Sequence, residues 1–191
     1  MTTLDLPRLY AIIDADLATE AGYTVTALAA AYLDGGAKLL QLRCSYAPTG
    51  QYLTWARDIV LRAARYEAKV IINNRADIAR LSGATGVHVG QDDLSVQQVQ
   101  RIAGEATPVG VSTHNVLQLE AALMGRMSYL AIGPIYETGT KMTGCAPLGL
   151  EYVRSAVKRC LGVPIVGIGG ITLERAADVI AAGAQSVAVI S

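Results

Sequence analysis

The sequence is poor in the residues that mark several common protein classes. Its 191 residues include no phenylalanine, one tryptophan, two histidines and three cysteines. Only 17% of the residues are charged, and 16 basic side chains balance 16 acidic ones. Because this balance creates no strong overall field, we expect no nucleic-acid partner. We also expect no membrane partner, since no apolar run reaches the roughly 18 residues that span a bilayer and the first residues lack a signal-peptide pattern.

The cysteines and histidines are too few for a site that binds a soft metal. The spacing of Cys44, Cys145 and Cys160 matches no zinc pattern. An odd number of cysteines suits a reducing compartment, so we expect a cytoplasmic location. Any metal would then be a hard cation held by carboxylate oxygens.

The sequence is rich in apolar runs that alternate with amphipathic segments. Hydrophobic residues make up 52% and the mean hydropathy is +0.35, which excludes a disordered chain. The length is typical of one domain, residues 1–191. Eight short apolar or β-branched runs predict strands at residues 9–13, 38–43, 69–72, 86–89, 108–111, 129–132, 164–168 and 186–190. Helix starts between the runs are marked by the capping residues Thr24, Ser95, Asn115 and Thr172.

Strands that alternate with helices predict a parallel sheet, because parallel neighbours need a crossover connection. Eight such units favour a closed (β/α)8 TIM barrel, with an open doubly wound sheet as the alternative. The eighth predicted strand runs to the end of the sequence, so the eighth helix is absent. A barrel without this helix would expose apolar strand surface. We therefore consider two alternatives. The natural chain continues beyond Ser191, which we favour, or a partner such as a second copy in a homo-oligomer covers the exposed strand surface.

Active sites of TIM barrels lie at the carboxyl ends of the strands, so polar residues at these ends are candidates for function. Gln41 and Arg43 are two residues apart on one predicted strand and therefore point to the same side, into the barrel mouth. The guanidinium of Arg43 suits an anionic ligand, and so does the later Lys141. The alternative is a structural arginine that pairs with a neighbouring carboxylate.

A glycine-rich segment, residues 167–170, ends the seventh predicted strand and leads into a helix after Thr172. Backbone N–H groups there can approach a phosphate closely, and a helix start favours negative charge. The alternative is a turn that serves packing alone. Residues 133–149 form the longest irregular stretch, and a loop of that length in a compact domain predicts a functional role.

Other polar residues at the strand ends carry weaker signals. Asn73 can serve a turn, and Asp93 can be a solvated carboxylate, a helix cap or a ligand of Mg2+ beside an anion pocket. His88 lies between two valines on a predicted strand and therefore faces the opposite side, toward the barrel interior. There it can have a structural role or contact a ligand. His114 follows the fifth predicted strand, and its alternative role is hydrogen bonding at the start of the next helix.

Four segments together carry a family resemblance: residues 86–93 (GVHVGQDD), 110–114 (GVSTH), 133–141 (GPIYETGTK) and 166–170 (VGIGG). On these motifs the chain resembles the thiamine-phosphate synthase family, and the related thiazole tautomerases, along almost its whole length. That family condenses 4-amino-2-methyl-5-hydroxymethylpyrimidine diphosphate with a thiazole phosphate to give thiamine phosphate and pyrophosphate. The resemblance implies a transferase that uses Mg2+ and acts on small molecules.

The resemblance also implies roles for individual residues. Arg43, Ser112 and Lys141 would take part in catalysis. Asp93, with Asn74, would bind the Mg2+ that bridges the pyrophosphate. The substrate-binding residues that it implies are Gln41, Arg43, Ser45, Asn73, His88, Ser112, His114 and Lys141, together with Thr138, Thr140, Gly170, Ile190 and Ser191 for the thiazole phosphate.

Two residues depart from the family pattern. Ser45 stands where the family has a lysine that contacts pyrophosphate, and Asn74 stands where it has a second Mg2+-binding aspartate. One positive charge and one metal carboxylate are therefore missing, so we expect slow or absent synthase activity. The alternatives are a thiazole tautomerase, in which His114 would act as general acid or base, and a catalytically silent protein that binds a phosphorylated ligand.

Overall fold

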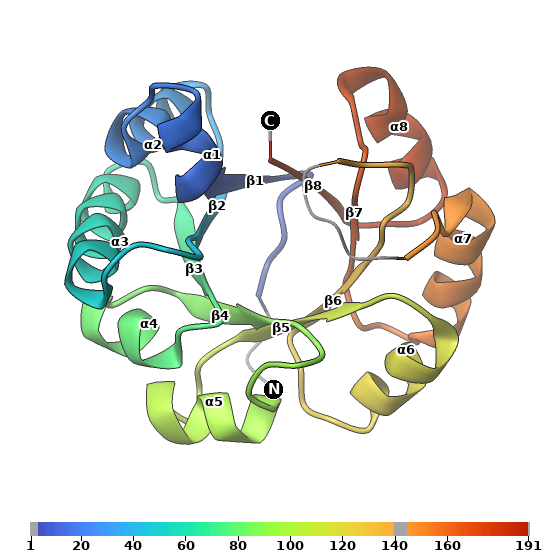
Figure 1. Ribbon diagram of the computed structural model, residues 1–191. Helices are drawn as coiled ribbons and strands as arrows, with labels where there is room; N and C mark the ends of the chain where they lie inside the picture. Colours follow the sequence, from blue (N-terminus) through green and yellow to red (C-terminus); the bar gives the residue numbers. More distant parts are fainter. Residues whose placement is uncertain (1–3, 140–144, 191) are drawn as a thin grey trace.

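The computed structural model describes residues 4–139 and 145–190. Eight parallel strands close into a barrel in chain order, with β1 paired to β8 as well as to β2 (Figure 1). This finding confirms the TIM barrel over the open sheet, and each predicted run overlaps one strand. The strands are β1 (Leu9–Asp14), β2 (Leu39–Arg43), β3 (Lys69–Asn73), β4 (Gly86–Val89), β5 (Val109–Thr113), β6 (Tyr129–Ile132), β7 (Ile165–Ile168) and β8 (Ser186–Val189).

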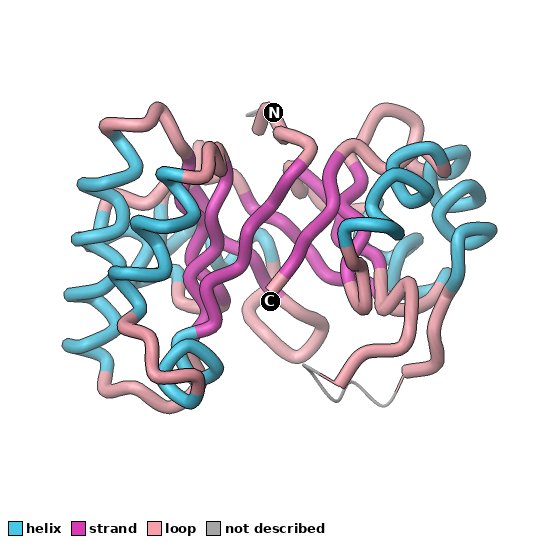
Figure 2. The backbone as a smooth tube through the Cα atoms, turned by 90° about the horizontal axis from the view of Figure 1, so that it is seen from above, coloured by secondary structure: helices cyan, strands magenta, loops and turns pink. Residues whose placement is uncertain are grey.

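The helices lie outside the barrel wall, as Figures 1 and 2 show. Two helices connect β1 to β2, and one helix follows each strand from β2 to β7. Within the described residues no helix follows β8. None of the helices in the described ranges has both the length and the apolar character that a membrane crossing requires. The helices are α1 (Ala15–Glu20), α2 (Val25–Asp34), α3 (Thr49–Ala64), α4 (Ala76–Ser82), α5 (Val96–Ala103), α6 (Val116–Leu123), α7 (Gly149–Arg159) and α8 (Leu173–Ala181).

Four helices begin at the capping residues that the sequence marked. The hydroxyl of Ser95 accepts the N–H of Gln98 while the Gln98 side chain accepts the N–H of Ser95, so α5 starts with a capping box. Thr24 and Asn115 each accept one N–H in the first turn of α2 and α6. Thr172 precedes α8 without a hydrogen bond from its side chain to the helix. A side-chain cap stabilises a helix by about 1 kcal/mol, which favours these boundaries.

Alternation along the strands divides the buried side chains into two layers. Leu40 and Leu42 pack between the barrel wall and the helices, whereas Leu39 faces the barrel interior. Full burial of a leucine side chain contributes about 1.5–3 kcal/mol, so both layers stabilise the barrel. The interior also holds Tyr10 and Tyr129, which are 1% and 0% exposed. Their hydroxyl groups need hydrogen-bond partners there, and the partners lie beneath the site described next.

Candidate active site

A cavity of about 480 Å³ opens at the carboxyl ends of the strands, and each of the eight strands contributes to its wall. Its size is in the range of small-molecule binding sites. Nine of the residues predicted from the sequence line this one cavity: Gln41, Arg43, Asn73, His88, Ser112, His114, Thr138, Gly170 and Ile190. The structure therefore brings these nine residues, from separate strand ends, to one cavity, and their roles there stay predictions.

Three other predicted residues are exposed and do not line the cavity: Ser45, Asn74 and Asp93. Ser45 follows β2, and its backbone N–H donates to a carboxylate oxygen of Asp16 at 2.9 Å. Thr140, Lys141 and Ser191 lie outside the described residues.

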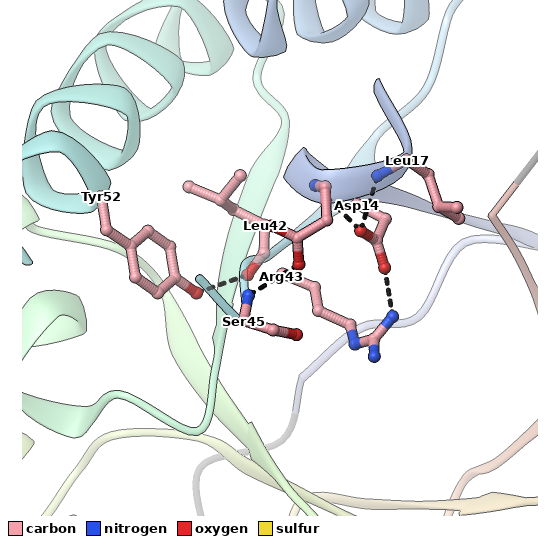
Figure 3. Close-up of polar contacts among 7 residues, drawn as sticks. Asp14, Leu17, Leu42, Arg43, Ser45 and Tyr52 are labelled. Atoms are coloured by element: carbon pink, nitrogen blue, oxygen red, sulfur yellow. Dashed lines mark hydrogen bonds and ion pairs between the residues drawn. The ribbon is translucent and has the colours of Figure 1, made fainter. Parts of the chain in front are cut away.

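Arg43 lines the cavity and forms an ion pair with Asp14 at the end of β1 (Figure 3). One Asp14 oxygen binds the guanidinium. The other accepts the N–H groups of Asp16 and Leu17 at 3.1 and 3.2 Å, so Asp14 also caps α1. The ion pair confirms the structural interpretation of Arg43, and because the arginine also lines the cavity, the ligand-binding interpretation stays a prediction.

A chain of hydrogen bonds crosses the floor of the cavity. Nε2 of Gln41 donates to the Tyr10 hydroxyl at 2.7 Å, and the Tyr10 and Tyr129 hydroxyl oxygens lie 2.9 Å apart. The Tyr129 hydroxyl lies 3.0 Å from Nδ1 of His88, and Nε2 of His88 lies 2.8 Å from Oγ of Ser112. The chain joins Gln41 of β2 to Ser112 of β5 through the barrel interior. Burial raises the pKa of both tyrosines, which keeps their hydroxyls protonated.

Asn73 lines the cavity, and its backbone carbonyl contacts a third buried tyrosine hydroxyl. The hydroxyl of Tyr52 in α3 donates to the carbonyl oxygens of Leu42 at 2.9 Å and of Asn73 at 3.2 Å. Burial is the main cause that raises the pKa of Tyr52. Because one hydroxyl contacts both strands at their carboxyl ends, it holds the ends of β2 and β3 at a fixed spacing.

His114 also lines the cavity, and the loop after β6 holds its ring. Nδ1 of His114 lies 2.6 Å from the carbonyl oxygen of Gly133. Since a carbonyl oxygen only accepts, Nδ1 carries a proton. The backbone N–H of His114 donates to the side chain of Gln118 at 2.7 Å, so His114 also forms a hydrogen bond at the start of α6. Nε2 is the ring atom through which His114 can exchange a proton with a ligand.

The glycine turn after β7 packs directly against the loop after β6. The N–H groups of Ile135 and Tyr136 donate to the carbonyl oxygens of Ile168 and Gly169 at 2.9 and 3.0 Å. Gly170 has a φ of 62°, and a Cβ atom there would lie 2.3 Å from the carbonyl oxygen of Glu137. Glycine is therefore required at position 170. The packing role and the position in the cavity wall occur together at this turn.

Arg175, in the first turn of α8, adds a cation to the cavity wall. Its Nη1 donates to the carbonyl oxygen of Gly170 at 2.8 Å, and its guanidinium carbon lies 4.6 Å from the centroid of the Tyr136 ring. Sequence reasoning missed this residue because an arginine on a helix normally indicates only a solvated face. The available signal was its place three residues after the helix-capping residue Thr172, beside a glycine turn.

Tyr10, Asp14 and Tyr129 join the site without having been predicted as site residues. Asp14 stood at a strand end, but no partner for it was visible in the sequence. The two tyrosines lie in apolar runs that the sequence predicts only as strands. The signal available was the hydroxyl itself, since a buried tyrosine normally needs a hydrogen-bond partner.

The residues expected to bind Mg2+ follow two neighbouring strands. The N–H of Asn74 donates to the carbonyl oxygen of His88 at 2.8 Å, and the carboxylate of Asp93 accepts the N–H of Gly90 at 2.7 Å. In residues 4–139 and 145–190, no group of three His, Cys, Asp or Glu side chains could hold a metal ion. One carboxylate and one amide fit an ion that takes its remaining ligands from substrate phosphates and water, which is usual for Mg2+.

Comparisons with known proteins agree with one another. A family model described as thiamine monophosphate synthase matches residues 9–191. A thiamine-phosphate synthase from Koribacter versatilis is 45% identical over 190 residues, which cover 98% of this chain and 89% of that protein. Another from Chloroflexus aurantiacus is 40% identical over 184 residues, which cover 96% of this chain and 83% of that protein.

A solved structure supports the same assignment. Thiamine phosphate pyrophosphorylase from Pyrococcus furiosus aligns with a TM-score of 0.86 at 27% identity, over 96% of this chain and 85% of that one. The match extends over the barrel and so includes the strands that build the cavity. From its sequence and its fold, this chain belongs to the thiamine monophosphate synthase family.

Proposed function

We propose that this chain is a thiamine-phosphate synthase. It is a transferase that condenses 4-amino-2-methyl-5-hydroxymethylpyrimidine diphosphate with a thiazole phosphate and releases pyrophosphate. The observation that carries the proposal is the single cavity, into which Arg43 of β2, Ser112 of β5 and Gly170 after β7 all face. The relatives that bear this name, at 45% and 40% identity, support it.

We assign the pyrimidine diphosphate to the part of the wall that holds Gln41, Arg43, Asn73 and Ser112. A guanidinium forms charge-assisted hydrogen bonds with phosphate oxygens, and the ion pair with Asp14 holds it in place. The amide and hydroxyl groups offer donors and acceptors to the pyrimidine ring. Lys141 would add a second cation.

We assign the thiazole phosphate to the part of the wall that holds Thr138, Gly170 and Ile190. The start of α8 lies beside this turn, and a helix start carries partial positive charge that favours a phosphate. Arg175 places a full positive charge at the same turn. Thr140 and Ser191 would complete this part of the site.

Two bonds change in the proposed reaction. The bond between the pyrimidine methylene carbon and the diphosphate oxygen breaks, and its electron pair leaves with pyrophosphate. The resulting cation is stabilised by resonance with the pyrimidine ring. The thiazole nitrogen then donates its lone pair to the methylene carbon, which forms the carbon–nitrogen bond of thiamine phosphate. The protein binds both rings side by side and stabilises the departing charge, so no protein nucleophile is needed.

Asp93 and Asn74 are the residues that would hold Mg2+ in the proposed site. When bound, the ion supplies positive charge to the leaving pyrophosphate. Arg43 supplies charge to the same group from the protein. Because Asn74 and Ser45 replace an aspartate and a lysine of the family pattern, we propose that the reaction is slow. The loss of one group that stabilises a transition state commonly reduces the rate by about 10²–10³.

A thiazole tautomerase is the second candidate, and the geometry of His114 favours it. Nδ1 of His114 is held by the Gly133 carbonyl, so Nε2 can take a proton from a ligand in the cavity. Such a reaction needs neither the diphosphate substrate nor Mg2+. Arg43 and its fixed orientation favour the synthase, since they suit a diphosphate.

The environment of the proposed enzyme stays a prediction from the sequence. Three cysteines suit the cytoplasm, and small molecules are its expected partners. A homo-oligomer likewise stays a prediction.

One assay separates the candidates. The purified protein is incubated with both substrates, with and without Mg2+, and thiamine phosphate is measured. Product that depends on the metal and on both substrates supports the synthase. Isomerisation of a thiazole carboxylate phosphate without the diphosphate would instead support the tautomerase. Absence of both reactions, with binding of the thiazole phosphate, would overturn both and leave a silent binding protein.

A further inference from the structure

The hydrogen-bond chain on the cavity floor has a direction that follows from its protons. Gln41 donates to the Tyr10 oxygen, so the Tyr10 proton is directed to the other partner of that hydroxyl, Tyr129. Tyr129 then directs its own proton to Nδ1 of His88. Nδ1 therefore accepts, and the ring proton lies on Nε2, which donates to Oγ of Ser112. In this arrangement each buried hydroxyl donates one hydrogen bond.

We infer that Tyr129 is a positioning residue that holds His88 as the neutral Nε2–H tautomer and thereby directs the Ser112 hydroxyl proton into the cavity. Ser112 already accepts the His88 proton, so it can donate its own proton to a ligand. A ligand atom that faces Oγ of Ser112 must then be an acceptor, such as a ring nitrogen or a phosphate oxygen. This inference rests on the proposed function where it names the pyrimidine diphosphate as that ligand.

The side chains and backbone packed around Tyr129 hold its ring in one position. The ring is 0% exposed and lies almost parallel to His88, with centroids 5.6 Å apart and an interplanar angle of 24°. The edge of Tyr10 approaches it at 6.0 Å and 77°. A Cβ atom at Gly110 would lie 2.0 Å from Cζ of Tyr129. The hydroxyl is therefore held at a fixed place between Tyr10 and His88.

The tyrosines also disfavour a doubly protonated His88. Such a ring would donate from Nδ1 to Tyr129, whose proton would then turn back to the Tyr10 oxygen. The Tyr10 proton would have no acceptor in the chain, and an unsatisfied buried donor is unfavourable by about 1–3 kcal/mol. Burial raises the pKa of both tyrosines, so neither can relieve this conflict by losing its proton.

The test is ¹⁵N NMR of the ligand-free protein labelled at histidine. The sequence has two histidines, so His114 serves as an internal reference. His114 must show Nδ1–H because Nδ1 faces the Gly133 carbonyl. We expect His88 to show the opposite tautomer, with a proton on Nε2 alone. A proton on Nδ1 of His88 would mean that the chain runs in reverse from a turned Gln41 amide, and it would overturn the inference.

Tyr129→Phe keeps the ring and removes the hydroxyl. We expect the His88 signals to change toward a mixture of tautomers. The Kd for the pyrimidine diphosphate should rise about tenfold, which corresponds to the loss of about one hydrogen bond, and the Kd for the thiazole phosphate should stay unchanged. Tyr152→Phe is the matched control, because the buried Tyr152 hydroxyl has no hydrogen-bond partner within the described ranges. It should leave the His88 signals and both Kd values unchanged.

An unchanged His88 tautomer in Tyr129→Phe would overturn the inference. If that variant does not fold, the spectrum of the parent protein still decides the tautomer, and Tyr10→Phe still interrupts the chain between Gln41 and Tyr129. Failure of the proposed function can be distinguished from failure of this inference. A parent protein with the expected tautomer but without thiamine phosphate formation would retain the role of Tyr129 and lose the synthase assignment.

Discussion

The Asp14 carboxylate holds Arg43 on one oxygen and the start of α1 on the other. Its side chain is 3% exposed and that of Arg43 is 21% exposed, so water screens the pair only partly. The ion pair thereby joins the ends of β1 and β2 (Figure 3), and its arginine lines the cavity. In the proposed synthase, Asp14 sets the direction from which the guanidinium meets the diphosphate.

Asp14→Asn removes the charge and keeps a good helix cap, because asparagine caps helices as well as aspartate. We expect kcat for thiamine phosphate formation to fall about tenfold as Arg43 loses its orientation. Asp77→Asn is the control, since Asp77 pairs with Arg75 in an exposed ion pair outside the cavity wall. That variant should change kcat by less than about twofold. Equal kcat values for Asp14→Asn and the parent would show that Arg43 needs no partner.

The double variant Ser45→Lys, Asn74→Asp restores the two groups of the family pattern. Both residues are exposed at strand ends, so the changes need no repacking. Asn74 has a φ of 63°, which asparagine and aspartate both adopt more readily than most residues. We expect synthase activity to rise about tenfold or more and the Mg2+ concentration for half-maximal rate to fall. The single variants separate the two effects. A double variant no faster than its parent would refute this account of slow turnover.

Gly110→Ala places a methyl group where the Tyr129 ring lies, with 2.0 Å between the new Cβ and Cζ. We expect the free energy of unfolding, measured with urea, to fall by about 1–3 kcal/mol or more from overpacking. Gly50→Ala is the control, because a Cβ there meets nothing within 4 Å and α3 gains a better helix former. Similar stability for the two variants would contradict the packing of Tyr129 against Gly110.

Stability should decline in alkaline solution. Burial raises the pKa of Tyr10 and Tyr129 above the ordinary value of about 10. Above that pH the unfolded chain loses tyrosine protons that the folded protein keeps, so the free energy of unfolding falls as pH rises. Each buried tyrosine contributes about 1.4 kcal/mol per pH unit. The free energy of unfolding, measured with urea between about pH 9 and pH 11, should fall less steeply with pH for Tyr129→Phe than for the parent. Parallel curves would contradict burial of that hydroxyl in a protonated state.

The sequence predicted the barrel because its strands are continuous apolar runs, and each overlaps a strand of the structure. It missed α1, which has six residues and is too short to show a helical stripe. Two-residue spacing correctly placed Gln41 and Arg43 on the inner side and Leu40 and Leu42 on the outer side. Such inferences need only local periodicity.

Contacts between distant strands could not be predicted in the same way. Tyr10 and Tyr129 are 119 residues apart, and no spacing indicates that their hydroxyls meet. The sequence predicted that Arg43 could pair with a carboxylate but did not identify Asp14. The register between β1 and β2 selects this partner, and the sequence does not show that register. Asp93 was expected at the mouth, yet the turn after β4 binds its carboxylate to Gly90 and leaves it outside the cavity wall.

Whether one cavity binds two phosphorylated rings can be decided by a crystal structure with both products bound. We expect thiamine phosphate with its phosphate at Gly170 and the start of α8, its pyrimidine between Gln41 and Ser112, and pyrophosphate at Arg43. Thiamine phosphate bound elsewhere on the protein, or pyrophosphate bound away from Arg43, would contradict it.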